Sequence, residues 1–291
     1  MHLAIIANPI AGGGRPYTKI RRYIDRWDHP GWTVELLPTQ RANHAGVLAL
    51  QLMERPPDLL AVCGGDGTIN EVATSLPNPA FPIAVLPGGT ANVLARELGL
   101  PLDPIRALKV ALNKNVLRAD LGELEGASRR RFTFVAGIGF DAYAVYKARP
   151  SLKARIGMAA YGVAVIECLR NYSFPEFHVA LNGQSFTATS CLVCNAKSYG
   201  GGMVFCPDAD MTDGFLDVLI IEGVHRAGMA RFLFSAWCGI QEKPSWVHRA
   251  RTKELSIDGP ASVMVETDGE LAGTLPVRIH LSLNSFPLVV P

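Results

Sequence analysis

The first part of the chain alternates short apolar runs with amphipathic stretches. Residues 2–7, 59–62 and 82–86 are almost continuously apolar, which is typical of parallel strands buried on both faces. Helical patterns between these runs predict helices over residues 15–27, 43–54, 68–76, 91–98 and 104–112. This alternation of strand and helix predicts a doubly wound three-layer α/β/α domain.

The pattern becomes rich in strands after residue 116. The expected strands cover residues 131–135, 177–181, 186–193, 215–221, 254–257, 262–266 and 277–283, with helices near 148–170 and 227–238. Asn182-Gly183 and Asp268-Gly269 are typical of tight hairpin turns. The second domain is therefore predicted to be an antiparallel β-sandwich. We place the first domain at residues 1–116, the second at 117–283 and a C-terminal segment at 284–291.

A glycine-rich turn follows each of the three apolar runs, at residues 8–14, 63–68 and 86–92. Glycine lets the backbone turn sharply and approach a ligand closely, with main-chain N–H groups pointing outward. A helix that begins just beyond the turn adds positive partial charge, so these turns suit the phosphates of a nucleotide. Asp66 adds a carboxylate for the accompanying Mg²⁺. The candidate phosphate-binding residues are Gly64, Gly65, Gly67 and Thr68 in one turn and Gly88, Gly89, Thr90 and Asn92 in the next.

Local structure offers an alternative explanation for each turn taken alone. Residues 64–67 match a tight turn, and residues 68–71 match a capping box, in which the Thr68 hydroxyl caps a helix and Glu71 reaches back. Three such turns at the carboxyl edge of one sheet favour a ligand site, because open α/β sheets bind ligands there. The chain lacks a P-loop motif, a Gly-x-Gly-x-x-Gly after a strand and the protein-kinase motifs, which argues against those three classes.

Composition narrows the class of protein further. A length of 291 residues allows two domains with their own cores, and a net charge of +2 argues against a dedicated nucleic-acid binder. Six cysteines do not suggest a disulfide scaffold, so we expect a reduced compartment and buried thiols at Cys191 and Cys194. The first apolar run ends at Asn8-Pro9, so no signal peptide is expected, and the apolar stretch 156–168 is too short to span a bilayer. The sequence therefore predicts a cytoplasmic protein.

Several further motifs occur in a fixed order along the chain. They are Asn8-Pro9 with the following glycines, Thr39, His44-Ala45, Gly64 to Thr68, Pro87 to Asn92, Gly137 to Ala142, Tyr199 to Gly202, Asp213-Gly214, Asp268-Gly269-Glu270 and Pro287 to Pro291. With this ordered set the chain resembles the diacylglycerol kinase catalytic-domain family, which also contains sphingosine kinases and bacterial lipid kinases. Gly-Gly-Asp-Gly-Thr alone is shared with NAD kinases and phosphofructokinases. The resemblance implies two domains with the active site in the cleft between them, and a final segment that returns to the first domain.

The resemblance also implies roles for individual residues. It implies ATP as phosphoryl donor with Mg²⁺, and it assigns Asn8 and Thr39 to the nucleotide pocket. Asp268 is the implied general base, with Glu270 as its polar or metal-linked neighbour. A carboxylate within hydrogen-bond reach of an alcohol can take its proton as the bond to phosphorus forms. From the pattern alone, Asp268-Gly269 is a hairpin turn, as in the comparable Asp258-Gly259.

A second acidic segment resembles the structural cation loop of the family. On that resemblance Asp213 supplies a carboxylate to Mg²⁺, while Asp210 and Leu216 supply main-chain carbonyls. The alternative is a solvated acidic turn. Asp141 resembles part of the interdomain cleft, with a structural salt bridge as its alternative. Val93 departs from the family, many members of which carry an acidic residue there.

Two basic clusters bear on the lipid side of the hypothesis. Residues 129–131 are all arginine, and four cations at 147, 149, 153 and 155 precede the apolar stretch. Such clusters attract anionic bilayers, although for either segment taken alone a solvated turn or a core helix is the favoured explanation. We interpret the chain as an ATP-dependent lipid kinase, most simply one that converts diacylglycerol to phosphatidic acid at the inner face of the membrane. The alternatives are a soluble-acceptor kinase of the NAD kinase type and a non-catalytic nucleotide- or lipid-binding protein. The oligomeric state, including a homodimer, stays open.

Overall fold

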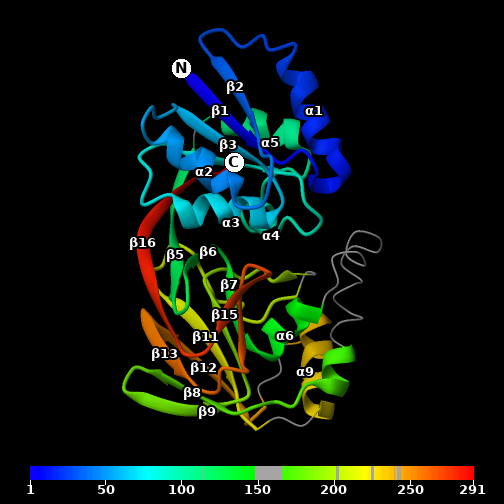
Figure 1. Ribbon diagram of the computed structural model, residues 1–291, viewed down its shortest axis with the longest axis vertical. Coiled ribbons are helices and arrows are strands. Elements are labelled where there is room, and N and C mark those ends of the chain that lie inside the picture. Colours follow the sequence, from blue (N-terminus) through cyan, green and yellow to red (C-terminus); the bar gives the residue numbers. More distant parts are fainter. Residues whose placement is uncertain (114, 148–165, 201–202, 224–225, 239, 241–243) are drawn as a thin grey trace. The chain divides into compact units, whose positions relative to one another are not determined.

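The computed structural model describes residues 1–113, 115–147, 166–200, 203–223, 226–238, 240 and 244–291 (Figure 1). The chain divides into two compact units: Met1–Ala119 with Leu283–Pro291, and Asp120–Ser282. The division after Ala119 lies three residues beyond the predicted end of the first domain at residue 116. Most of the helix expected near 148–170, with the cations at 149, 153 and 155, lies outside the described residues.

A parallel sheet forms the centre of the first unit. Its strands are β1 (His2–Ala7), β2 (Thr33–Pro38), β3 (Leu59–Gly64) and β4 (Ile83–Pro87), in the order β2-β1-β3-β4. The end of β16 (Val277–Val289) pairs in parallel with β4 through Leu288 and Ile83. In this order the topological switch lies between β1 and β3, because the chain leaves β1 for β2 on one side and returns to β3 on the other.

Helices cover both faces of this sheet. On one face α1 (Arg15–Ile24) packs with α5 (Pro104–Ala111), and on the other α2 (His44–Leu52) packs with α3 (Asp66–Ser75). Two short elements, the 3₁₀ helix Ala11–Gly14 and α4 (Val93–Glu97), follow β1 and β4. Successive strand residues such as Ile5 and Ile6 point to opposite faces of the sheet, and both are fully buried. Burial on both faces explains the continuous apolar runs. The predicted three-layer α/β/α arrangement is confirmed.

The predicted capping box at residues 68–71 is wrong. Helix α3 begins two residues earlier, at Asp66, with Gly65 as its N-cap, so Thr68 lies inside the first turn. The carboxylate of Glu71 instead accepts hydrogen bonds from the main-chain N–H groups of Asn43 (2.9 Å) and Ala45 (3.0 Å) at the start of α2. Glu71 therefore caps the neighbouring helix, because Asn43 has a positive φ and makes no side-chain cap of its own.

The second unit is the predicted antiparallel sandwich. One sheet has the order β12 (Val247–Thr252), β11 (Leu216–Ile221), β10 (Ser190–Cys194), β7 (Val135–Gly139), β14 (Met264–Thr267) and β15 (Glu270–Thr274). The other contains the first part of β16, β13 (Glu254–Asp258), β8 (Phe177–Leu181), β9 (Gln184–Ala188), β5 (Val116–Glu125) and β6 (Arg129–Phe132). Buried residues of both sheets, including Phe132, Val193 and Ile257, form one core. Helices α6 (Phe140–Lys147) and α9 (Arg226–Trp237) complete the described elements named here.

Two predicted strands are each two strands in the structure. Residues 131–135 divide between β6 and β7, and residues 186–193 divide between β9 and β10, each pair belonging to different sheets. The pattern runs on across each break because residues 132–135 and 188–191 are all buried. The hairpin turns at Asn182-Gly183 and Asp268-Gly269 are confirmed, with positive φ at all four residues. Cys191 and Cys194 are buried free thiols as predicted, and burial raises the pKa of Cys191. Among the described residues no helix is long and apolar enough to cross a membrane.

The buried Glu123 of β5 organises one predicted basic cluster. Its carboxylate lies 2.5 Å from Arg129 and 2.7 Å from Arg131, while His280 lies at 3.5 Å. Only 3% of the Glu123 side chain is exposed. Burial opposes ionisation, but the hydrogen bonds and charges of Arg129 and Arg131 outweigh it, so the pKa of Glu123 is lowered. Two of the three arginines at 129–131 therefore have their charge compensated within the unit.

We expect Glu123→Ala to lower the free energy of unfolding at pH 7 by about 1–3 kcal/mol, because it leaves Arg131 largely buried beside a cavity. A lowered pKa stabilises the fold above the ordinary pKa of glutamate, and this stabilisation is lost as the pH falls through the folded value. The difference between wild type and variant should therefore shrink in acid. Urea unfolding at pH 7 and below pH 4 measures both effects. Glu125→Ala, at an exposed position of the same strand, is the control, and equal losses in the two variants would contradict the assignment.

Candidate functional site

The glycine turns after β3 and β4 lie backbone against backbone. The N–H of Gly88 donates to the carbonyl of Gly64 at 2.7 Å. A Cβ atom at Gly89 would stand 2.5 Å from the Cα of Gly65, and a Cβ at Gly12 would stand 2.5 Å from the carbonyl oxygen of Gly88. Because any side chain at these two positions would collide with main-chain atoms, the three turns approach this closely only as glycine. The structure thus brings together all three predicted turns.

Polar side chains tie the turns to one another. The Asn8 side-chain Nδ2 donates to the Thr68 hydroxyl at 3.3 Å, and the side-chain Oδ1 of Asn8 accepts from the N–H of Ile10 at 3.1 Å. Asp66 Oδ1 accepts from the N–H of Leu94 in the first turn of α4, at 3.3 Å. Thr39 follows β2, and its N–H donates to the carbonyl of Ala7 at 2.8 Å. Asn8, Thr39, Asp66 and Thr68 therefore belong to one group at the carboxyl ends of the strands.

This edge of the sheet suits an anion for two reasons. The N–H groups at the start of a helix point toward a ligand, and the dipole of α3, which begins at Asp66, adds positive potential there. The turns after β1 and β3 also flank the topological switch, where open α/β sheets bind ligands. Gly88 and Gly89 contribute differently from the prediction, since the N–H of Gly89 donates to Asn92 Oδ1 at 2.8 Å and that of Gly88 to Gly64. These two amides, with Asn92, therefore shape the turn after β4. Of the other predicted residues, Gly65 and Gly67 in the turn after β3 are half-buried, and Thr90 is exposed.

The Asp268 carboxylate of the second unit is held by four hydrogen bonds. Oδ2 accepts from the N–H (2.7 Å) and hydroxyl (2.8 Å) of Thr133, and Oδ1 accepts from the N–H groups of Phe134 (3.0 Å) and Val135 (3.1 Å). Asp268 is 5% exposed, and these donors occupy the break between β6 and β7. The four lone-pair positions of the carboxylate are thereby used, so it must release one donor before it can accept a proton from a substrate. Glu270 is half-exposed, 3.7 Å from Arg130.

A second acidic group lies close to this turn. Asp141 accepts a hydrogen bond from the Tyr199 hydroxyl, and Glu266 Oε2 accepts from the N–H of Gly269 at 2.7 Å. Among the described residues no ion pair of Asp141 accounts for the salt bridge considered as its alternative. Glu266 and Thr133 were not among the site residues predicted from the sequence. The only available signal was the position of Glu266 in a mainly apolar strand two residues before Asp268.

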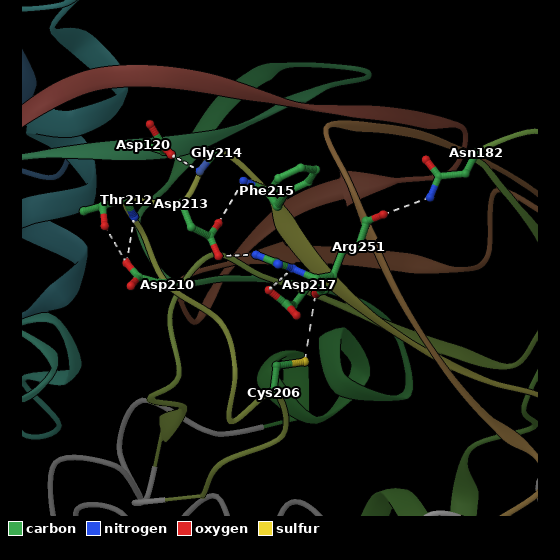
Figure 2. Close-up of polar contacts among 10 residues, drawn as sticks. All are labelled: Asp120, Asn182, Cys206, Asp210, Thr212, Asp213, Gly214, Phe215, Asp217 and Arg251. Atoms are coloured by element: carbon green, nitrogen blue, oxygen red, sulfur yellow. Dashed lines mark hydrogen bonds and ion pairs between the residues drawn. The ribbon is translucent and has the colours of Figure 1, made fainter.

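In the acidic loop at residues 210–216, the carboxylates of Asp210 and Asp213 accept hydrogen bonds from other groups of the protein (Figure 2). Asp210 Oδ1 accepts from the N–H (2.9 Å) and hydroxyl (2.7 Å) of Thr212, and Asp213 Oδ1 accepts from the N–H of Phe215 (3.0 Å). The guanidinium of Arg251 pairs with Asp213 and lies 3.6 Å from Asp217. Burial raises the pKa of Asp217, and Arg251 acts against this shift.

These contacts test whether the loop fits a cation as the resemblance implied. Asp213 is the implied carboxylate ligand, and its charge is compensated by Arg251. Leu216 begins β11, paired with Thr252 of β12. In the described part of the chain no group of three or more His, Cys, Asp or Glu side chains is arranged to hold a metal ion. In this structure Arg251 pairs with the Asp213 carboxylate, so a divalent cation would have to share that carboxylate or displace the arginine, and the cation loop stays a prediction.

Comparisons with known proteins agree with the fold and extend over the whole chain. Two relatives are each a diacylglycerol kinase: one from Mycobacterium tuberculosis strain H37Rv is 28% identical over 280 residues, covering 94% of this chain and 90% of that protein. One from Bacillus subtilis strain 168 is 28% identical over 292 residues, covering 99% and 95%. A crystal structure of a diacylglycerol kinase from Bacillus anthracis strain Sterne superposes with a TM-score of 0.75 at 23% identity, covering 100% of this chain and 97% of that one. It shows the same fold.

Family models match both parts of the chain in order. Residues 2–124 match the diacylglycerol kinase catalytic domain, which contains the three glycine turns. Residues 134–290 match the YegS C-terminal NAD kinase beta sandwich-like domain, which contains Asp268 and the acidic loop. The second match alone covers more than half of the 291 residues. The chain therefore belongs to the diacylglycerol kinase catalytic-domain family and carries its YegS-type C-terminal sandwich.

Proposed function

We propose that this protein is an ATP-dependent lipid kinase that transfers the γ-phosphoryl group to a hydroxyl of diacylglycerol and yields phosphatidic acid. The observation that carries the proposal is the meeting of three glycine turns at the switch point of the sheet, where α3 begins. Membership of the family and the activity named for its relatives support the class of reaction. Diacylglycerol is the simplest acceptor consistent with both.

The nucleotide half of the reaction falls to the first unit. The first-turn amides of α3 and the Thr68 hydroxyl bind phosphate oxygens, while Asn8 and Thr39 line the pocket around the nucleotide. Asp66 has one oxygen directed to α4, and its carboxylate is the acidic group of the turns that fits Mg²⁺. Bound Mg²⁺ would neutralise charge on the phosphates.

The acceptor half falls to Asp268. As the lipid hydroxyl oxygen attacks the γ-phosphorus, Asp268 takes the hydroxyl proton, and the bond to the leaving ADP oxygen breaks. The Thr133 hydroxyl is the donor most easily released, because it rotates without moving the backbone. Glu270 lies two residues away as a further polar group at the same turn.

A soluble-acceptor kinase of the NAD kinase type is the second candidate. The observation that favours it is the match of residues 134–290 to an NAD kinase-like sandwich. Contact with an anionic bilayer would distinguish a lipid kinase from this candidate. Arg129 and Arg131, which were considered for that contact, are instead paired with Glu123. Membrane contact, the absence of a nucleic-acid partner and the homodimer therefore stay predictions that an assay has to test.

Our first prediction for this function concerns Asp268. With labelled ATP and mixed micelles, wild type should label diacylglycerol and not NAD, and Asp268→Asn should lower kcat by about 10²–10⁴-fold. The affinity for ATP should stay near wild type, since Asp268 lies in the other unit. Asp258→Asn is the matched control, an exposed aspartate before a glycine. Label in NAD alone would overturn the lipid assignment, and full activity of Asp268→Asn would remove Asp268 as base.

The second prediction separates the two roles of Asp66. Asp66→Asn retains a side-chain oxygen that can accept from the N–H of Leu94 but removes the negative charge. We expect melting temperature close to wild type with kcat lowered by about 10²-fold or more, because Mg²⁺ loses a carboxylate ligand. Differential scanning fluorimetry and the kinase assay measure the two effects. Asp28→Asn, at an exposed position of the same unit, should change neither, and wild-type kcat in Asp66→Asn would disprove the metal role.

The third prediction concerns the acidic loop at residues 210–216. If Arg251 compensates Asp213, neither Mg²⁺ nor EDTA should shift the melting temperature of the nucleotide-free protein. Arg251→Met should lower that temperature by about 2–4 °C for each 1 kcal/mol lost, because Asp213 and Asp217 then repel each other. Arg278→Met, at an exposed position of β16, is the control. A clear stabilisation of wild type by Mg²⁺ without nucleotide would show that the loop does bind a cation.

A further inference from the structure

Three segments distant in the sequence meet above Gly137 of β7. Glu266 of β14 is the cross-strand neighbour of Gly137, Asp141 stands in the first turn of α6, and Tyr199 follows β10. A Cβ at residue 137 would stand 1.9 Å from Asp141 Oδ2 and 2.7 Å from Glu266 Oε1. The missing side chain of Gly137 thus leaves the space in which the two carboxyl groups face each other.

The outer oxygens of this pair have donors, and the inner ones have each other. Asp141 Oδ1 accepts from the Tyr199 hydroxyl, and Glu266 Oε2 accepts from the N–H of Gly269 at 2.7 Å. The inner oxygens, Asp141 Oδ2 and Glu266 Oε1, are buried and receive no donor from another group among the residues that the structure describes. Glu266 is 1% exposed. Two acceptors in contact inside a protein require a hydrogen between them.

The electrostatics agree with this geometry. Burial raises the pKa of Asp141, against the hydrogen bonds of Tyr199 and Glu266. Burial also raises the pKa of Glu266 well above its ordinary value, and the negative charges of Asp141 and Asp268 add to that shift while the N–H of Gly269 opposes it. Two buried carboxyl groups in this position titrate as a pair that holds one proton.

We propose that Asp141 and Glu266 share one proton between their inner oxygens, and that this hydrogen-bonded pair positions the Asp268-Gly269 turn for phosphoryl transfer. Glu266 is thus a positioning residue, acting through the N–H of Gly269. The turn is then fixed from two sides, by Glu266 at Gly269 and by Thr133, Phe134 and Val135 at Asp268. The positioning role rests on the proposed function, whereas the shared proton does not.

Amide substitutions give a sharp test because each supplies a fixed hydrogen. In Glu266→Gln the amide can donate to Asp141 while its oxygen still accepts from Gly269, and Asp141→Asn is the mirror case with Tyr199. In the double variant two NH₂ groups face each other and neither has an acceptor. We expect both single variants to keep the wild-type melting temperature within a few degrees and the double variant to lose far more than the sum. Glu254→Gln, an exposed change of the same type on β13, is the control.

Infrared spectroscopy tests the proton without any assay of activity. At pH 7 wild type and Glu254→Gln should show the carbonyl absorption of a protonated carboxyl group, sensitive to D₂O, that Glu266→Gln lacks. A wild-type spectrum identical to that of Glu266→Gln, or additive losses in the double variant, would overturn the shared proton whatever the enzyme phosphorylates.

Kinetics test the positioning role. We expect Glu266→Ala to lower kcat about tenfold to a hundredfold with KM for ATP nearly unchanged, and Glu266→Gln to restore most of kcat. A loss caused by unfolding would also lower the apparent kcat at unchanged KM, so it is recognised by a lower melting temperature and a smaller folded fraction at the assay temperature, and kcat is calculated per folded enzyme. Equal losses in Glu266→Ala and Glu266→Gln would overturn the positioning role. If wild type phosphorylates none of the acceptors, the proposed function fails while the melting and infrared results still decide the shared proton.

Discussion

The close contact between the turns after β3 and β4 is the constraint on which the first unit depends. Gly64 and Gly65 lie against Gly88 and Gly89 with main-chain atoms in direct contact, and Gly12 closes against the carbonyl of Gly88. This contact brings the starts of α3 and α4 together. The carboxylate of Asp66, in the first turn of α3, accepts a hydrogen bond from the N–H of Leu94 in the first turn of α4. A glycine that looks like a phosphate ligand in the sequence therefore also serves the fold. The two functions are compatible, since the amides that bind inside the protein, at Gly88 and Gly89, differ from those at the start of α3.

The second unit depends in the same way on one carboxylate. The chain changes sheet between β6 and β7, which leaves the N–H groups of Thr133, Phe134 and Val135 outside either ladder, and Asp268 accepts all three. The β14–β15 turn is thereby attached to the crossing point of the sandwich. A catalytic role at this position would use a group whose direction is already fixed by the fold, which limits reorganisation during reaction.

Sequence patterns predicted the architecture well because burial leaves a strong periodic signal. The continuous apolar runs gave β1, β3 and β4, and Asn182-Gly183 and Asp268-Gly269 gave their hairpins. The patterns failed where a strand has no clear alternation of apolar and polar residues and where two strands follow one another without a polar break. β12, with the sequence Val-His-Arg-Ala-Arg-Thr, was not predicted because its half-exposed cations hide the alternation. The break at Thr133 is invisible because the residues on either side of it, Phe132 and Phe134, are both buried. For the site, motifs located the residues, but no pattern shows that Arg251, a residue distant in sequence, faces Asp213.

The buried acidic groups of the second unit show why side-chain partners are hard to predict from sequence patterns. The second unit stabilises them in four different ways: arginines at Glu123, main-chain amides at Asp268, an arginine at Asp217 that also pairs with the exposed Asp213, and a shared proton proposed for Asp141 and Glu266. Only Glu123 has its arginine partners nearby in the sequence, six and eight residues away, whereas the other three solutions depend on residues that are distant in the sequence. Like charges about 4 Å apart would otherwise repel by about 4 kcal/mol at an effective dielectric constant of 20. Glu266 and Asp268 stand two residues apart, yet one faces a carboxyl group and the other a set of donors, because successive strand and turn positions point in different directions. A site in which one carboxyl group shares a proton while the next one accepts hydrogen bonds needs this kind of difference between neighbouring positions of one hairpin.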